Sequence, residues 1–199
     1  VAGGGGGGGS SATVGQSGLA IQTATLGNSS VTVDWRLGVG GGPVDILVGS
    51  PTWSGFFSVN TVGTDFQYYQ GLGIPTTNGT AITFTTLHIG FKIIRAASGA
   101  INVYATQADG TTETASASLT TLNAAASDAL DFIAKVNSTT STDYYWRKNA
   151  GAISSATNLA TNMPANLAGA AAYVRVALTD ATVSTQTILN ILGSHYQRP

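Results

Sequence analysis

The side chains that could catalyse a reaction are few and form no recognisable pattern. Glu113 is the only glutamate, and the eight aspartates are scattered singly, mostly beside residues that favour turns. Glycosidases need two carboxyl groups about 5–10 Å apart, one on each side of the bond that they cleave. No such pair is evident, so the aspartates are expected to cap turns, and the sequence predicts no catalytic residue.

The two histidines, His88 and His195, offer no stronger case for catalysis. No Gly-x-Ser-x-Gly segment frames a nucleophile for a Ser-His-Asp triad, and His88 lies within an apolar run, which favours a structural role. Two histidines without cysteine do not complete a zinc site. Calcium held near Asp128 and Asp131 is the alternative for a metal, but no known loop signature surrounds them. We therefore predict no metal, no cofactor and no enzymatic activity.

Aromatic side chains offer a binding chemistry instead, because exposed Tyr and Trp rings stack on sugar rings and are also buried in subunit interfaces. Neighbouring residues of a strand point to opposite faces, so Tyr145 is expected to face away from Tyr144 and Trp146. One face of that strand should therefore expose an aromatic ring. The candidates for a subunit-interface or glycan-stacking site are Trp53, Tyr68, Tyr69, Tyr145 and Trp146, and burial in the core is the third possibility.

The composition excludes several classes of function. Charged residues make up only 9% of the 199 residues, against about 25% in an average soluble protein. The net charge of −1 provides no basic field for nucleic acid, and no apolar stretch approaches the roughly 18 residues of a membrane span. Cysteine is absent, which removes disulfides and thiolate chemistry. Asn-x-Ser/Thr triplets at Asn28, Asn78 and Asn137 matter only if the source glycosylates secreted protein.

The elements that must position these side chains are strands. From about residue 17 onward, short β-branched and aromatic runs alternate with Gly, Asn, Asp and Pro, which predicts an all-β antiparallel sandwich. Residues 30–37 alternate so that Trp35 faces the core. Residues 81–95 predict one long strand in which Gly90 marks a bulge or a point of close packing. Further strands are expected at 130–136, 142–148, 171–178 and 186–197, with a turn at 149–151.

A hairpin is the sharpest local prediction. Asp109-Gly110 suits a two-residue turn between strands at 101–108 and 111–119. The alanine-rich segments 123–129 and 165–172 contain Asn, Ser and Gly, which favour loops over helices.

The start of the chain differs from the rest. Residues 3–9 are seven consecutive glycines, followed by two serines. This composition predicts a flexible arm or linker over residues 1–16, followed by a single sandwich domain over 17–199. Packing of the glycine run against a neighbouring subunit is the alternative.

Several motifs resemble a known family. Residues 88–92 read His-Ile-Gly-Phe-Lys, and a strand with Val-Tyr-Ala-Thr, the Asp-Gly turn and Thr-Glu-Thr follow. Later come Tyr-Tyr-Trp-Arg-Lys-Asn at 144–149 and Ala-Thr-Asn-Leu-Ala-Thr-Asn-Met-Pro at 156–164. Over about residues 50–197 the chain resembles the concanavalin-like jelly-roll domains of bacteriophage tail fibres, head fibres and other virion surface proteins. The resemblance implies a virion structural or attachment role and a homo-oligomer, and it carries over no catalytic residue.

The leading hypothesis is a non-enzymatic structural, decoration or fibre protein on a phage particle. It would assemble with other virion proteins as a homo-oligomer, for which we expect a trimer, and it would lie on the virion surface or outside the cell. The alternative is a carbohydrate-binding adhesion module on a virion or bacterial surface that binds host surface glycans. Trp53, Tyr68 or Tyr145 would then form its stacking platform.

Overall fold

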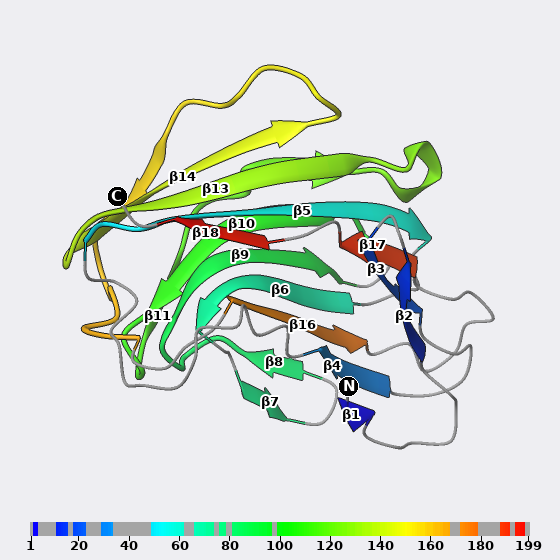
Figure 1. Ribbon diagram of the computed structural model, residues 1–199, viewed down its shortest axis with the longest axis horizontal. Helices are drawn as coiled ribbons and strands as arrows, with labels where there is room; N and C mark the ends of the chain where they lie inside the picture. The colour runs from blue at the N-terminus through cyan, green and yellow to red at the C-terminus, as the bar shows by residue number, and fades with distance from the viewer. Residues whose placement is uncertain are drawn as a thin grey trace.

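Most of the strands that the structure describes lie in two antiparallel β-sheets that pack face to face (Figure 1). The computed structural model describes residues 2–3, 11–15, 18–22, 29–33, 49–61, 66–73, 76–78, 81–96, 99–167, 172–178, 188–191 and 194–197. Within these, it describes side chains over 49–58, 67–73, 76, 82–96 and 99–167. The predicted all-β, concanavalin-like jelly-roll sandwich is confirmed.

One sheet, here called the β9 sheet, is built around the strand that carries His88. Its order is β1 (Ala2–Gly3), β4 (Ser29–Val33), β16 (Ala172–Leu178), β6 (Phe66–Gly73), β9 (His88–Arg95), β10 (Ile101–Ala108) and β11 (Glu113–Ala115). The short strand β12 (Thr120–Leu122) also pairs with β10. A separate hairpin, β7 (Thr76–Asn78) and β8 (Ala81–Thr83), lies beside this sheet.

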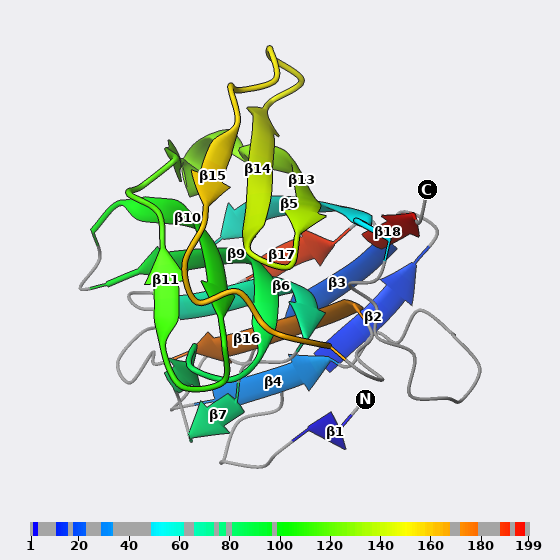
Figure 2. The same cartoon turned by 90° about the vertical axis from the view of Figure 1, so that its left-hand side faces the viewer.

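The other sheet, here called the β13 sheet, contains the aromatic strand, which is the strand with Tyr144, Tyr145 and Trp146. Its order is β15 (Thr157–Leu159), β14 (Ser141–Lys148), β13 (Ala129–Ser138), β5 (Thr52–Thr61), β17 (Ile188–Ile191), β3 (Gly18–Gln22) and β2 (Ser11–Gly15). β18 (Ser194–Gln197) pairs with β5 as well. Figure 2 shows that β15 and the β7–β8 hairpin lie on opposite sides of the sandwich.

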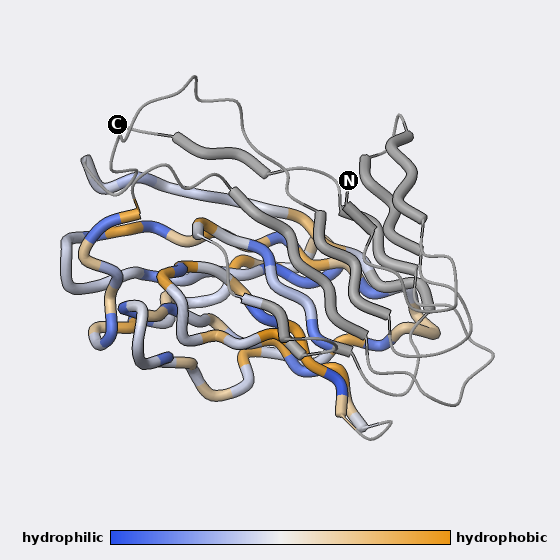
Figure 3. The backbone as a smooth tube through the Cα atoms, turned by 90° about the horizontal axis from the view of Figure 1, so that it is seen from below, coloured by the Kyte–Doolittle hydropathy of each residue, from blue (hydrophilic) through white to orange (hydrophobic). Residues whose placement is uncertain are grey.

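The core lies between the sheets because alternate residues of each strand are apolar. In β13, Leu130, Phe132, Ala134 and Val136 are buried, whereas the residues between them are partly or fully exposed. Figure 3 shows hydrophobic and hydrophilic positions alternating along the backbone in the same way. Across the core, the centroid of the Phe91 ring in the β9 sheet lies 4.7 Å from the centroid of the Phe132 ring in the β13 sheet. Each large apolar side chain buried in this way stabilises the fold by about 1.5–3 kcal/mol.

The predicted close packing at Gly90 is confirmed, and no bulge occurs there. Gly90 lies directly opposite Gly71 of β6 in an unbroken register. The Tyr69 ring covers the pair, and a Cβ atom on Gly90 would lie 2.8 Å from Tyr69 Cε2. Two glycines are therefore needed so that the aromatic ring can lie flat against the backbone.

The single strand predicted over 81–95 is wrong, because the chain turns between β8 and β9 at residues 84–87. β8 pairs with β7 instead of continuing into β9. The turn allows Ile82 and Phe84 to pack against Tyr69 on the outside of the β9 sheet. A tertiary apolar contact therefore overrides the local strand pattern.

The hairpin at Asp109-Gly110 is confirmed, but its predicted two-residue turn is wrong. Ala108 pairs with Glu113, so the loop contains four residues. Asp109 Oδ1 accepts hydrogen bonds from the backbone N–H groups of Thr111 and Thr112, both at 2.8 Å. The aspartate side chain thus closes a wider loop than the dipeptide alone suggests, and the returning segment is split into β11 and β12.

The remaining predictions have mixed outcomes. Strands at 130–136, 142–148 and 171–178 are present as β13, β14 and β16, whereas 186–197 contains two strands, β17 and β18. In the turn after β14, Gly151 N–H donates to the Lys148 carbonyl at 2.9 Å, as the sequence predicts. Within 123–129, where the sequence favours a loop, Ala124–Ala126 form a single short 3₁₀ turn, and β13 begins at Ala129.

Some predictions fall outside the described residues. Trp35 is one of them, since β4 is described only to Val33. Within the predicted arm, residues 2–3 form β1, which pairs with β4, and residues 11–15 form β2, which pairs with β3. The boundary between arm and domain stays a prediction. No helix among the described residues has the length and apolar character that crossing a membrane requires.

Candidate functional site

Polar and aromatic side chains that could bind a ligand gather in two places on the described part of the chain. One is a hydrogen-bonded network on the outer face of the β9 sheet. The other is a pocket on the outer face of the β13 sheet. Each is built from neighbouring strands whose register places the side chains opposite one another.

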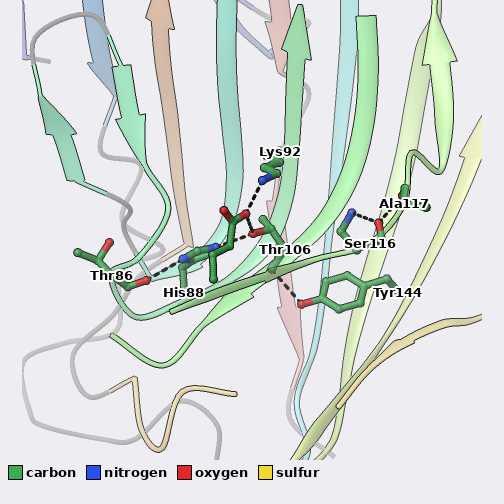
Figure 4. Close-up of polar contacts among 9 residues, drawn as sticks. Thr86, His88, Lys92, Thr106, Ser116, Ala117 and Tyr144 are labelled. Atoms are coloured by element: carbon green, nitrogen blue, oxygen red, sulfur yellow. Dashed lines mark hydrogen bonds and ion pairs between the residues drawn. The ribbon is translucent and has the colours of Figure 1, made fainter. Parts of the chain in front are cut away.

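The network connects His88, Lys92, Thr106 and Glu113 (Figure 4). His88 Nδ1 lies 2.7 Å from the Thr86 carbonyl oxygen, and its Nε2 lies 2.9 Å from Thr106 Oγ1. Thr106 Oγ1 lies 2.6 Å from Glu113 Oε1, and Lys92 Nζ reaches the same oxygen at 2.5 Å. The Lys92 ammonium also lies over two aromatic rings, which adds a cation–π attraction.

This network has one proton too few when His88 is neutral and Glu113 is ionised. The Thr86 carbonyl only accepts, so a neutral His88 carries its proton on Nδ1, and Nε2 must accept from Thr106. Thr106 has a single hydroxyl proton, and both His88 Nε2 and Glu113 Oε1 are within its reach. Burial nevertheless lowers the pKa of His88 to about 4, because desolvation outweighs the opposing effects of the Thr86 carbonyl and the Glu113 charge.

The network does not provide a catalytic site, although a hydroxyl and an imidazole lie at hydrogen-bonding distance. His88 and Thr106 are fully buried. The Tyr69 and Phe84 rings pack edge-on against the imidazole, with ring centroids 5.3 and 5.9 Å away. A substrate cannot reach the hydroxyl, and the structural role predicted for His88 agrees with this arrangement.

The pocket lies on the outside of the β13–β14 hairpin and has a volume of about 130 Å³. Its walls are formed by Asp131, Ile133, Tyr145, Trp146, Arg147 and Ile153. The hairpin register sets Ile133 opposite Tyr145 and Asp131 opposite Arg147. The lining therefore contains an apolar and aromatic pair, Ile133 and Tyr145, with the charged pair Asp131 and Arg147 beside it.

The charged pair is strongly coupled yet accessible. Arg147 donates to Asp131 Oδ2 from Nη2 at 2.6 Å and from Nε at 2.8 Å. The two side chains are 41% and 38% exposed. Both therefore keep hydrogen-bonding capacity for a ligand, since a guanidinium has five N–H donors and a carboxylate has two acceptor oxygens.

The loop after β14 supplies the remaining wall. Ile153 is 60% exposed, which is unusual for a large apolar residue. The next residue, Ser154, fixes the loop against β14, because its N–H donates to the Trp146 carbonyl and its hydroxyl accepts from the Trp146 N–H. Ile153 is thus held in place beside Tyr145 instead of being buried.

The candidate residues from the sequence divide into two groups. Trp53, Tyr68 and Tyr69 are fully buried, so their candidacy for an exposed stacking or interface surface is wrong: strand alternation turns Trp53 and Tyr68 into the core, and the β8 segment covers Tyr69. Tyr145 and Trp146 both line the pocket.

Within the aromatic strand, the predicted alternation holds for the first two residues. Tyr144 is fully buried and donates to the Thr106 carbonyl at 3.1 Å. Tyr145 faces the outside. Trp146 is only partly buried: it packs against the core and also lines the pocket.

Asp128 and Asp131, the two residues of the calcium alternative, lie in different environments. Asp128 is bound by Lys148 at 2.7 Å and by Asn149 at 2.6 Å, whereas Asp131 is bound by Arg147. Each carboxylate thus has its own cationic partner. No cluster of three or more His, Cys, Asp or Glu side chains that could hold a metal ion occurs within the described ranges.

Sequence reasoning missed the pocket residues Ile133, Arg147 and Ile153, and it considered Asp131 only as a possible calcium ligand. The turn at Thr139-Thr140 pairs Ser138 with Ser141, but a β-bulge between Val136 and Ser138 then shifts the register by one residue. The pairs Asp131–Arg147 and Ile133–Tyr145 therefore do not follow from the turn residues alone. The position of Ile153 depends on a loop that no local pattern specifies.

Comparison with known proteins supports the fold and no closer relationship. No protein-family model matches the chain, and a search of curated proteins finds no significant match. Among solved structures, a lectin from Bauhinia forficata in complex with GalNAc matches with a TM-score of 0.50 at 7% identity, covering 95% of this chain and 91% of the lectin. A carbohydrate esterase from the Shiga toxin-encoding bacteriophage phi24B matches with a TM-score of 0.51 at 12% identity, covering 98% and 89%. At these identities the likeness establishes that the chain has the lectin-like β-sandwich fold.

Proposed function

We propose that this protein is a non-enzymatic carbohydrate-binding module and that its site is the pocket around Tyr145. The observation that carries the proposal is the composition of that pocket, in which an aromatic and aliphatic surface adjoins an accessible ion pair. Sugars present apolar C–H faces and hydroxyl groups side by side. The pocket offers a matching surface for each.

The chemistry of the pocket suits a neutral sugar ring. An aromatic contact contributes about 0.5–1.5 kcal/mol beyond the area that it buries, and a hydrogen bond to a charged group contributes about 1.5–3 kcal/mol. Ile153 and Ile133, which line the same pocket as Tyr145, add apolar contact. A single site of this size would bind weakly, so display of several copies would raise the overall affinity through avidity.

A binding role without catalysis is favoured by the state of the carboxylate. Among the described residues that line the pocket, Asp131 is the only carboxylate, and Arg147 holds it by two hydrogen bonds. Hydrolysis of a glycosidic bond would need a second carboxyl group placed across the substrate. The two structural neighbours, a lectin in complex with GalNAc and a carbohydrate esterase, support a carbohydrate ligand, whereas the argument against catalysis rests on the carboxylates of the pocket.

Binding to a glycan array, followed by calorimetry with the best ligand, tests the proposal. Tyr145→Ala should weaken binding at least tenfold, whereas Tyr145→Phe should retain most of it because the ring remains. Tyr104→Ala is the matched control, since Tyr104 is a partly buried tyrosine on the outer face of the opposite sheet. Absence of binding to any glycan, or equal loss in Tyr145→Ala and Tyr104→Ala, would refute the proposal.

The second candidate is a structural or decoration protein of a virus particle, present as a homo-oligomer. The run of seven glycines, which has the composition of a linker, and the 9% content of charged residues support it, because a linker and a weakly charged surface suit a repeated surface subunit. This role is compatible with glycan binding, since a particle would display many copies of the pocket. Sedimentation of the purified chain tests it, and a monomer at every concentration would count against it.

A further inference from the structure

We propose that the site binds an internal stretch of a linear, uncharged glycan chain, lying along β13 and β14 and spanning more than one sugar unit. This inference rests on the proposed carbohydrate-binding function and adds the class of ligand and its direction on the sheet. It is carried by side chains that extend beyond the pocket on the same face.

Three cross-strand pairs follow one another on the outer face of the hairpin. Asp131 lies opposite Arg147, Ile133 opposite Tyr145, and Lys135 opposite Asp143. Successive pairs are two residues apart, so they are spaced by about 7 Å along the strands. Tyr145 therefore has a polar pair on each side, and a chain stacked on its ring can continue in both directions.

The second polar pair is extended by β15. Asn158 lies opposite Asp143 in the register and donates to its Oδ1 at 2.7 Å on the exposed surface. Hydrogen bonds from the Asn158 and Asn137 amides, and then the positive charge of Lys135, lower the pKa of Asp143. Asp143 is therefore an ionised acceptor held in a fixed orientation, ready for a hydroxyl group on a neighbouring sugar unit.

The size of the pocket favours a chain over a single sugar. Sites for small molecules usually have volumes of about 300–1,000 Å³, and this pocket has about 130 Å³. One ring would bury little surface there. Contacts with the Asp143–Asn158 pair would supply the additional hydrogen bonds that make binding measurable.

The charges favour neutral sugars. Asp131 neutralises Arg147 through two hydrogen bonds, and Lys135 lies opposite the Asp143 carboxylate. A hydroxyl can donate to a carboxylate and accept from a guanidinium without separating them. A uronate or sulfate would instead compete with Asp131 for Arg147 and would approach two carboxylates, so it would bind more weakly.

The test is calorimetry with cello-, malto-, manno- and xylo-oligosaccharides of one to six units, with oligogalacturonates as the charged series. For at least one neutral series, affinity should rise at least tenfold from one to four units and then level off. Oligogalacturonates should bind at least tenfold more weakly than the best neutral series at equal length.

Variants separate this inference from the proposed function. Tyr145→Ala should abolish binding at every length, whereas the double variant Asp143→Ala/Asn158→Ala should remove only the gain with length and leave the shortest ligands unaffected. The Thr121→Ala variant, at an exposed position on the other sheet, is the control. Affinity that is already maximal for a monosaccharide, or tighter binding of the charged series, overturns the inference while the carbohydrate site stands. Loss of binding to every neutral series and to the array removes both.

Discussion

A single hydroxyl proton on Thr106 has two acceptors within reach, the His88 imidazole and the Glu113 carboxylate. The network as a whole would be fully hydrogen-bonded with one more proton. Desolvation opposes that proton, because His88 and Thr106 are fully buried. Because burial opposes the protonation that the hydrogen-bond network would favour, His88 becomes a determinant of stability against acid.

We predict that stability falls between pH 6.5 and pH 4 because of His88. Its pKa is lowered from 6.5 to about 4 in the folded state, so the unfolded chain binds more protons in this window. The contribution is fully present above pH 6.5 and is lost as the pH falls towards 4. The loss is of order 3 kcal/mol, since each pKa unit corresponds to about 1.4 kcal/mol.

Denaturant unfolding at several pH values measures this effect, and His88→Gln should flatten the profile within the window. His195→Gln is the control for the other histidine. Asp109, Asp128 and Asp143 have their pKa values lowered below 3.8, so their contributions are lost at more acidic pH. Parallel profiles for the wild type and His88→Gln would contradict the prediction.

At the scale of an element, the contact between β6 and β9 depends on two glycines lying opposite each other. A Cβ atom on Gly90 would collide with the Gln70 carbonyl oxygen and with the Tyr69 ring. Because one obstacle is backbone, a side-chain rotation alone cannot relieve the clash. The two strands would have to move apart.

We therefore expect Gly90→Ala to destabilise the fold by about 3 kcal/mol or more, as strong overpacking does. Thr121→Ala, at an exposed strand position, should change stability by less than about 0.5 kcal/mol. The free energies of unfolding of both variants, obtained from denaturant curves, give the comparison. A Gly90→Ala protein as stable as the wild type would show that the strands can separate without cost.

Much of the fold could be predicted from the sequence, because strand patterns and turn residues are local signals. The strands around Phe132, Tyr144 and Val174 were predicted within a few residues. The break between β8 and β9 was not, since it depends on Phe84 packing against Tyr69, which lies 15 residues earlier in the sequence. The pairing of β5 with β17 and β18 was also inaccessible, because it joins segments that are far apart along the chain.

The candidate site was predicted only in part. Tyr145 and Trp146 were identified because aromatic residues are conspicuous. Their type alone did not distinguish them from Trp53 and Tyr68, which are fully buried. Burial is a property of the register between strands and sheets, and the sequence did not reveal that register directly.

At the scale of the whole molecule, β5 holds the β13 sheet together. β13 pairs with one of its edges, and β17 and β18 pair with the other. Without the last two strands, the second edge of β5 would expose unpaired backbone groups beside the core residues Trp53 and Phe57.

We predict that deletion of residues 188–199 abolishes cooperative unfolding and causes aggregation. Deletion of residues 1–9 is the control. It removes β1, a two-residue strand at the edge of the other sheet, and should leave the melting temperature nearly unchanged. Thermal melts and light scattering measure both variants. A C-terminally truncated chain that melts cooperatively would contradict this prediction.

The position of β5 has a further consequence for how the chain is made. Residues 52–61 are synthesised before the strands that pair with them, and one of these, β17, follows about 130 residues later. At about 5–20 residues per second, β5 waits several seconds with one edge unoccupied. Because such long-range pairing is also slow to form, the nascent chain passes through an aggregation-prone interval, and its yield in a cell should depend on chaperone capacity and on the rate of translation.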